Sequence, residues 1–140
     1  MAILLEQVFP VEAGAYATAG EASTTIKRKL KQLGIDANVL RRVSVASYEV
    51  ELNLVIHSRG GVLTLEVEPG RVRLVSRDAG PGIPDVELAM REGYSTANEE
   101  ARSLGFGAGM GLPNMKRNAD EFAITSTVGV GTDISMIFHI

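Results

Sequence analysis

The chain contains no cysteine and only two histidines, His57 and His139, among its 140 residues. Without cysteine it can form neither disulfides nor thiolate metal sites, and it has no thiol nucleophile. With only two imidazoles, a zinc site would need carboxylate ligands as well, so we expect none. The absence of cysteine suits a reducing compartment, and we expect a cytoplasmic protein.

Positive charge and long hydrophobic runs are also scarce. Fourteen basic residues face seventeen acidic ones, which gives a net charge of −3. Duplex binding needs clustered Lys and Arg, so we expect no nucleic-acid partner. No segment approaches the ~18 apolar residues of a membrane span, and Glu6 interrupts the short apolar N-terminus, so we expect no membrane partner. The hydrophobic content of 45% instead predicts one globular domain over residues 1–140.

Hydrophobic periodicity predicts strands and helices that are grouped along the chain. We expect a strand at 3–11, helices at 15–33 and 36–58, a hairpin at 61–78, helices at 85–92 and 111–120, and a hairpin at 122–140. This grouping predicts an α+β fold, a two-layer sandwich with helices packed on one face of a mostly antiparallel sheet. Residues 93–109 lack apolar periodicity and are rich in glycine, so we expect a mobile, functional loop there.

The helix predicted at 36–58 carries polar residues on a face that should be buried. Glu49, Asn53 and His57 follow one another at intervals of four and form a narrow stripe between apolar residues. A buried carboxylate without a partner is costly, so an ion, a ligand or a core hydrogen-bond network must satisfy it. An acid and an amide one turn apart also suit Mg²⁺. The residues predicted to point the opposite way are Ser44, Glu51 and Val55.

Two glycine-rich segments are candidates for ligand binding. Asp78-Ala-Gly80-Pro-Gly82-Ile-Pro84 places a carboxylate at a strand end, above a stiff backbone that a flat ring can approach, although a plain turn is the alternative. Glycine also occupies every second position from 105 to 111, directly before a helix. Converging N–H groups and the helix N-terminus would make a phosphate cradle there, and a hinge is the alternative. The segment is neither a Walker A motif nor a dinucleotide fingerprint.

The order of these motifs resembles the Bergerat-fold (GHKL) ATP-binding superfamily of gyrase, heat-shock chaperones, mismatch-repair ATPases and histidine kinases. The matching pieces are Glu-x-x-x-Asn on a helix, Asp-x-Gly-x-Gly, a lid, Gly-x-Gly-x-Gly before a helix, and Gly-Thr in the last hairpin. The segments at 80–85, 93–96 and 115–122 are similar to the small serine kinases and anti-sigma factors of bacterial partner switching. The lid segment from 97 to 107 is longer than expected for the switch kinases.

The resemblance implies a role for each matching residue. It makes Glu49 the general base, Asn53 the magnesium ligand, and Asp78 the acceptor for the amino group of adenine. The other nucleotide-binding positions that it implies are Gly80 and Gly82 under the base, Ser95 and Thr96 at the start of the ATP lid, Gly105, Gly107, Gly109, Gly111 and Leu112 around the phosphates, and Thr132 beside Asp78. His57 would lie behind these residues.

The resemblance also implies a function. It predicts a serine/threonine protein kinase that uses ATP and Mg²⁺ to phosphorylate a small STAS-domain protein. It leaves open whether a sigma factor is a second partner and whether the chain forms a homodimer. A nucleotide-gated binding module without phosphoryl transfer is the alternative, and Glu49 favours the kinase because a pure switch needs no base. The catalytic part of a histidine kinase ranks lowest, because no helical hairpin carries a phosphoacceptor histidine.

Overall fold

The computed structural model describes residues 3–91 and 111–140. Within these residues the strands form one sheet in the spatial order β1-β2-β3-β5-β4, with every neighbouring pair antiparallel. The strands are β1 (Leu5–Val11), β2 (Gly61–Glu68), β3 (Arg71–Asp78), β4 (Glu121–Thr127) and β5 (Gly131–His139). The two hairpins predicted from alternating hydrophobicity, β2–β3 and β4–β5, are therefore confirmed.

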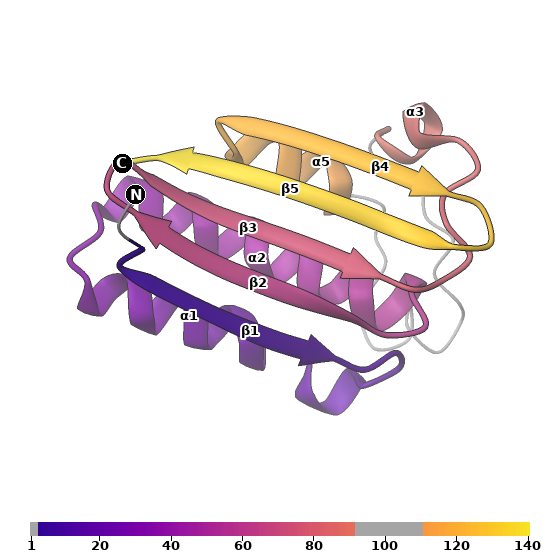
Figure 1. Cartoon of the computed structure of the whole chain (residues 1–140), viewed down its shortest axis with the longest axis horizontal. Helices are drawn as coiled ribbons and strands as arrows, with labels where there is room; N and C mark the ends of the chain where they lie inside the picture. The colour runs from indigo at the N-terminus through magenta and orange to yellow at the C-terminus, as the bar shows by residue number, and fades with distance from the viewer. Residues whose placement is uncertain (1–2, 92–110) are drawn as a thin grey trace.

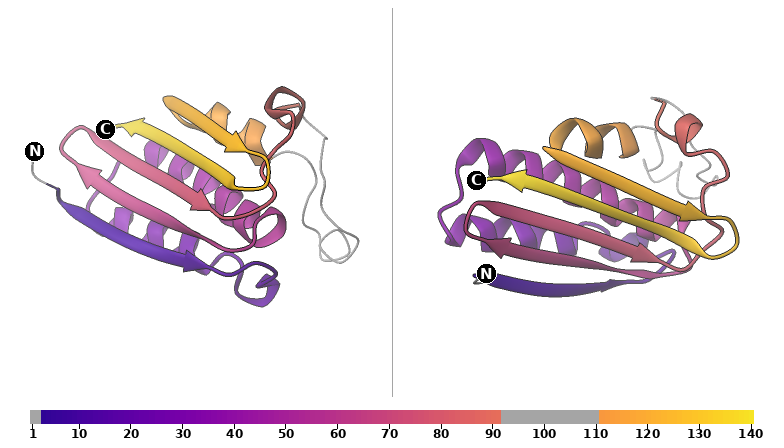
Figure 2. Two further views of the ribbon diagram at one scale, coloured as in Figure 1. Left: turned by 45° about the vertical axis from the view of Figure 1, so that its right-hand side comes forward. Right: turned by 45° about the horizontal axis from the view of Figure 1, so that its top comes forward.

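The main helices pack together on one face of this sheet (Figure 1). They are α1 (Glu21–Gln32), α2 (Ala37–His57) and α5 (Gly111–Asn118), with a 3₁₀ turn η1 (Tyr16–Thr18) and the short helix α3 (Val86–Ala89) between other elements. Figure 2 shows the same two layers from other directions. The predicted α+β sandwich is confirmed. No helix among the described residues is long and apolar enough to cross a membrane.

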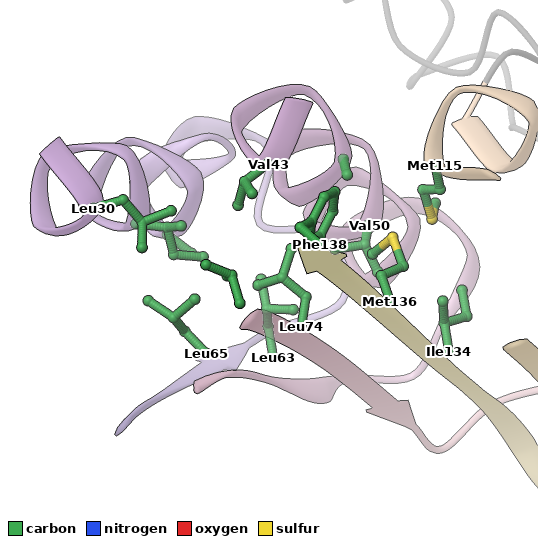
Figure 3. Packing of buried hydrophobic residues seen from close by; sticks show 14 of the residues in the cluster. Leu30, Val43, Val50, Leu63, Leu65, Leu74, Met115, Ile134, Met136 and Phe138 are labelled. Carbon is green, nitrogen blue, oxygen red and sulfur yellow. The ribbon is translucent and has the colours of Figure 1, made fainter. Parts of the chain in front are cut away.

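The hydrophobic core fills the space between the two layers. Leu30 of α1, Val50 of α2 and Leu65, Leu74 and Phe138 of the sheet are all fully buried, and Figure 3 shows them converging. Each such side chain contributes about 1.5–3 kcal/mol by leaving water. Because α2 lies along the middle of the sheet, its position is set by this core, and so is the direction of its polar side chains.

The first helix starts later, and the last helix ends earlier, than the sequence predicted. The first helix starts at Glu21 and not near residue 15, because Gly20 adopts a left-handed φ of 101°. Helix α2 starts where expected, and Asp36 caps it by accepting a hydrogen bond from the main-chain N–H of Asn38 at 3.0 Å. Helix α5 ends at Asn118, whose carbonyl accepts a hydrogen bond of 3.0 Å from the Arg42 guanidinium.

Helix α2 is buried on more sides than the sequence predicted. Glu51, expected to point away from the buried stripe, is only 3% exposed. Its carboxylate accepts hydrogen bonds from the main-chain N–H groups of Ala22 (3.1 Å) and Ser23 (3.0 Å) in the first turn of α1. Val55, on the same side, is buried as well. Glu51 and Val55 leave α2 opposite the predicted stripe, and that side is buried as well because α1 packs against it and the positive end of α1 satisfies the carboxylate.

Replacing Glu51 should therefore destabilise the fold. We expect Glu51→Gln to lower the free energy of unfolding by at least about 1 kcal/mol, because an amide offers one oxygen to two donors and turns its own N–H₂ toward one of them. Urea denaturation measures the difference. Glu12→Gln, at an exposed residue after β1, is the matched control and should change stability by less than about 0.5 kcal/mol. Equal stability of Glu51→Gln and wild type would contradict the capping role.

Candidate functional site

The middle of α2 lies directly against the first residue of α5. A side-chain carbon at Gly111 would lie 3.3 Å from Oε2 of Glu49 and 3.8 Å from Oδ1 of Asn53. Both oxygens therefore face the N-terminus of α5, and glycine at this position places no side chain against them. The structure thus brings together the predicted acid–amide pair and the last predicted phosphate-binding glycine, although Glu49 and Asn53 precede Gly111 by 62 and 58 positions in the sequence.

The carboxylate of Glu49 is held from one side. Its Oε1 accepts a hydrogen bond of 3.4 Å from Nδ2 of Asn114, and Oδ1 of Asn114 accepts one of 3.0 Å from Arg117. Burial raises the pKa of Glu49, and the hydrogen bond from Asn114 lowers it again in part. The result is a half-buried carboxylate that binds a proton more readily than an exposed one, which is the property of a general base.

His57, the third member of the predicted stripe, occupies the last turn of α2. Burial lowers the pKa of its imidazole, because the charged form loses its hydration. A neutral ring is therefore favoured at neutral pH. His57 therefore brings little positive charge to this end of the helix.

Asp78 stands at the end of β3 with its two oxygens in different surroundings. Oδ1 accepts a hydrogen bond of 3.1 Å from the main-chain N–H of Thr132, while no described residue donates to Oδ2. Burial raises the pKa of Asp78; the Thr132 N–H lowers it and the nearby charge of Asp133 raises it. Gly131 allows this approach, because a side chain there would collide with the carbonyl of Asp78. Within residues 3–91 and 111–140, Oδ2 thus keeps its capacity to accept a hydrogen bond from a ligand.

The loop after Asp78 is anchored by main-chain hydrogen bonds and by close packing at its glycines. Gly82 has a left-handed φ of 73°, and a side chain there would collide with the main chain of Thr127. Main-chain hydrogen bonds join the loop to both neighbouring segments: Arg59 N to Ala79 O (2.8 Å), Ala79 N to Gly60 O (3.1 Å), Gly80 N to Val130 O (3.1 Å) and Gly129 N to Pro81 O (2.8 Å). The loop therefore connects the end of α2 to the β4–β5 turn.

Sequence reasoning missed Ser126, which supports this end of the site. Its Oγ accepts a hydrogen bond of 2.7 Å from the main-chain N–H of Ile83 and lies 2.8 Å from Oγ1 of Thr132. Thr132 thus uses its hydroxyl on Ser126 and its N–H on Asp78. The missed signal was a polar residue at an inward position of β4, since Ile124, two residues earlier, packs against the core.

The predicted residues fall into two groups joined by α2. One group is Glu49, Asn53 and Gly111, and the other is Asp78, Gly80, Gly82 and Thr132. Between them α2 rises about 13 Å from Glu49 to Ser58, whose Cα lies beside Gly80. Leu112 is buried in the core at the start of α5. The predicted residues Ser95, Thr96, Gly105, Gly107 and Gly109, and the predicted mobile loop at 93–109, lie outside the described residues.

Comparison with known proteins gives a consistent set of matches. Residues 24–140 match the model of the histidine kinase-, DNA gyrase B- and HSP90-like ATPases. The chain is 33% identical over 111 residues to the serine/threonine-protein kinase RsbT of Bacillus subtilis (strain 168), covering 76% of this chain and 77% of that protein. It is 32% identical over 125 residues to the anti-sigma F factor of Geobacillus kaustophilus (strain HTA426), covering 85% of this chain and 82% of that protein.

Solved structures with low sequence identity share the fold. The SiaB–SiaC complex from Pseudomonas aeruginosa contains a chain that superposes with a TM-score of 0.65 at 14% identity, over 97% of this chain and 89% of that one. The RsbU and RsbW domains of Rv1364c from Mycobacterium tuberculosis superpose with a TM-score of 0.59 at 18% identity, over 94% of this chain and 31% of that one.

Proposed function

Because the chain belongs to the histidine kinase-, DNA gyrase B- and HSP90-like ATPase family, we propose that it is an ATP- and Mg²⁺-dependent serine/threonine protein kinase acting on a small STAS-domain protein. The observation that carries the proposal is the placement of Glu49 Oε2 and Asn53 Oδ1 together at the start of α5. The kinase RsbT among the relatives supports phosphoryl transfer, and the anti-sigma F factor supports a protein partner.

The Asp78 end of the site suits adenine. Oδ2 of Asp78 has no donor among the described residues, and the exocyclic amino group of adenine is a donor. Guanine presents a carbonyl oxygen at the corresponding position, which a carboxylate repels. We therefore expect the protein to select ATP and ADP over GTP. Gly80 and Gly82 let the loop approach the main chain at Ser58 and at Thr127, and this close packing holds the loop beside Asp78.

The Glu49 end suits the phosphates and the acceptor hydroxyl. The N-terminus of α5 carries partial positive charge that favours phosphate oxygens. Mg²⁺, which prefers oxygen ligands and would bind through Asn53, supplies charge neutralisation when it is present with the phosphates. Glu49 accepts the proton of a serine or threonine hydroxyl while that oxygen forms a bond to the γ-phosphorus and the bond to ADP breaks. The described residues thus supply a base, a metal ligand and an anion site.

The proposal is tested by incubating the protein with Mg-ATP and the STAS-type proteins encoded beside it. Phosphoserine or phosphothreonine on one of these proteins, found by mass spectrometry, is the expected result. A second candidate function, a nucleotide-gated binding module, is favoured by the identity with the anti-sigma F factor. ATP-dependent binding of a partner without any transfer to it would make that second function the better explanation.

Removal of Asn53 should uncouple nucleotide binding from magnesium. With one neutral oxygen from the protein, Mg²⁺ binds well only when phosphates supply further ligands. We expect wild type to bind ATP at least ~10-fold more tightly with Mg²⁺ than with EDTA, and Asn53→Ala to show less than a ~3-fold difference. Calorimetry measures both affinities. The control Asn38→Ala, at an exposed position of α2, should keep the dependence of ATP affinity on Mg²⁺. If Asn53→Ala kept that dependence too, the metal role of Asn53 would be refuted.

A further inference from the structure

The two oxygens of Glu49 lie in different surroundings. Oε1 accepts the hydrogen bond from Asn114 Nδ2 at 3.4 Å, whereas Oε2 is the oxygen nearest to Gly111 and the start of α5. No described residue donates to Oε2. One oxygen is therefore tied to the protein, and the other faces the place where the phosphates and the acceptor hydroxyl would meet.

Arg117 determines which way the amide of Asn114 points. An asparagine amide has a donor end and an acceptor end of nearly the same shape. In the structure the guanidinium of Arg117 donates to Oδ1 at 3.0 Å, so the N–H₂ end faces Glu49. The reversed amide would put Oδ1 against the carboxylate and Nδ2 against the guanidinium, and both contacts would be repulsive. Asn114 lies three residues from both Gly111 and Arg117, which makes it a neighbour of each on the surface of α5.

We propose that Asn114 is a positioning residue that fixes Oε1 of Glu49 and thereby directs Oε2 to the substrate hydroxyl, with Arg117 setting the orientation of its amide. This inference rests on the proposed role of Glu49 as the base. Without the hydrogen bond, the carboxylate of Glu49 is free to rotate about its last side-chain bond, and a smaller share of molecules has a correctly placed oxygen. Small misplacements of a reacting group cost up to about 100-fold in rate.

Kinetics of the single variants provide the first test. We expect Asn114→Ala to lower kcat about 10-fold and to leave the KM for ATP within about 2-fold of wild type, since the hydrogen bonds of the amide are with Glu49 and Arg117. Alanine is a better helix former than asparagine, so folding of α5 is not at risk. The matched control is Asn118→Ala one turn later, whose amide donates to the main-chain carbonyl of Asn114 and should leave kcat unchanged.

A double-mutant cycle separates positioning from a general structural effect. If Asn114 acts only through Glu49, Asn114→Ala should change the residual rate of Glu49→Gln by less than about 2-fold. If the double variant lost rate by the product of the two separate reductions, the inference would be overturned. The same holds for an Asn114→Ala variant that transfers at the wild-type rate.

NMR of the free protein tests the contact without any phosphoryl transfer. The side-chain N–H₂ signals of Asn114 should shift in Glu49→Gln, and they should be unchanged in the distant variant Glu12→Gln. Unshifted signals in Glu49→Gln would overturn the inference, even if wild type transfers phosphate. A shift in a protein that transfers to no partner would instead reject the proposed function and leave Asn114 as the residue that holds Glu49.

Discussion

Glu49→Gln should bind Mg-ATP almost as tightly as wild type and transfer its γ-phosphoryl group at least ~100-fold more slowly. Glutamine keeps the length and shape of the side chain and an oxygen for the hydrogen bond from Asn114. It lacks the basicity that removes a proton from the acceptor hydroxyl. Binding is measured by calorimetry and transfer by the rate at which the phosphorylated partner appears under single-turnover conditions.

The neighbouring acid on the same helix provides the control for this result. Glu51→Gln makes the same chemical change two residues later, but its carboxylate binds the first turn of α1 and not the site. Measured well below its unfolding midpoint, Glu51→Gln should transfer at close to the wild-type rate. Full-speed transfer by Glu49→Gln would mean that Glu49 is a structural residue and would remove the base from the proposed mechanism.

Asp78→Asn should weaken ATP binding about 100-fold, the scale expected when a charged hydrogen-bond acceptor is lost from a partly buried site. The amide of asparagine has one acceptor and one donor end. If its oxygen keeps the N–H of Thr132, its N–H₂ faces the amino group of adenine, and if it turns round, its N–H₂ faces Thr132. Either orientation places two donors against each other. Calorimetry with ATP, ADP and GTP measures the loss.

Asp133→Asn is the matched control for this second experiment. It removes an exposed carboxylate whose charge raises the pKa of Asp78 but which makes no hydrogen bond to Thr132. ATP should bind to it as tightly as to wild type. Wild-type protein that bound GTP as tightly as ATP would disprove the adenine assignment, whatever Asp78→Asn did.

Several features were predictable because they depend on local sequence. Alternation in β2 and β3 and a turn at Pro69-Gly70 fix one hairpin, and Asp36 marks the start of α2. The order of the motifs was sufficient to predict the ATPase family, and the predicted enzyme class, a serine/threonine kinase, is that of the relative RsbT. The specific roles of Glu49, Asn53 and Asp78 remain predictions.

Other features depend on which elements pack together, and the sequence alone did not reveal them. The helical projection placed Glu51 opposite Glu49, but a projection of α2 cannot show that the positive end of α1 lies beside Glu51. Asn114 looks like an ordinary surface residue until Glu49, 65 residues earlier in the sequence, is brought against it, whereas Ser126 was marked by its inward position on β4. A polar side chain that serves a site through another residue has no motif of its own.

The contact between Glu51 and α1 also constrains how this protein can be re-engineered. Glu49 and Glu51 leave α2 about 200° apart around the helix axis, so the two carboxylates serve different neighbours on opposite sides of one helix. The core holds α2 itself, while the main-chain N–H groups of Ala22 and Ser23 hold only Glu51. A chimaera that exchanges α1 for that of a relative would leave Glu51 buried without donors, and would lose stability, unless the new helix began at the same height beside α2.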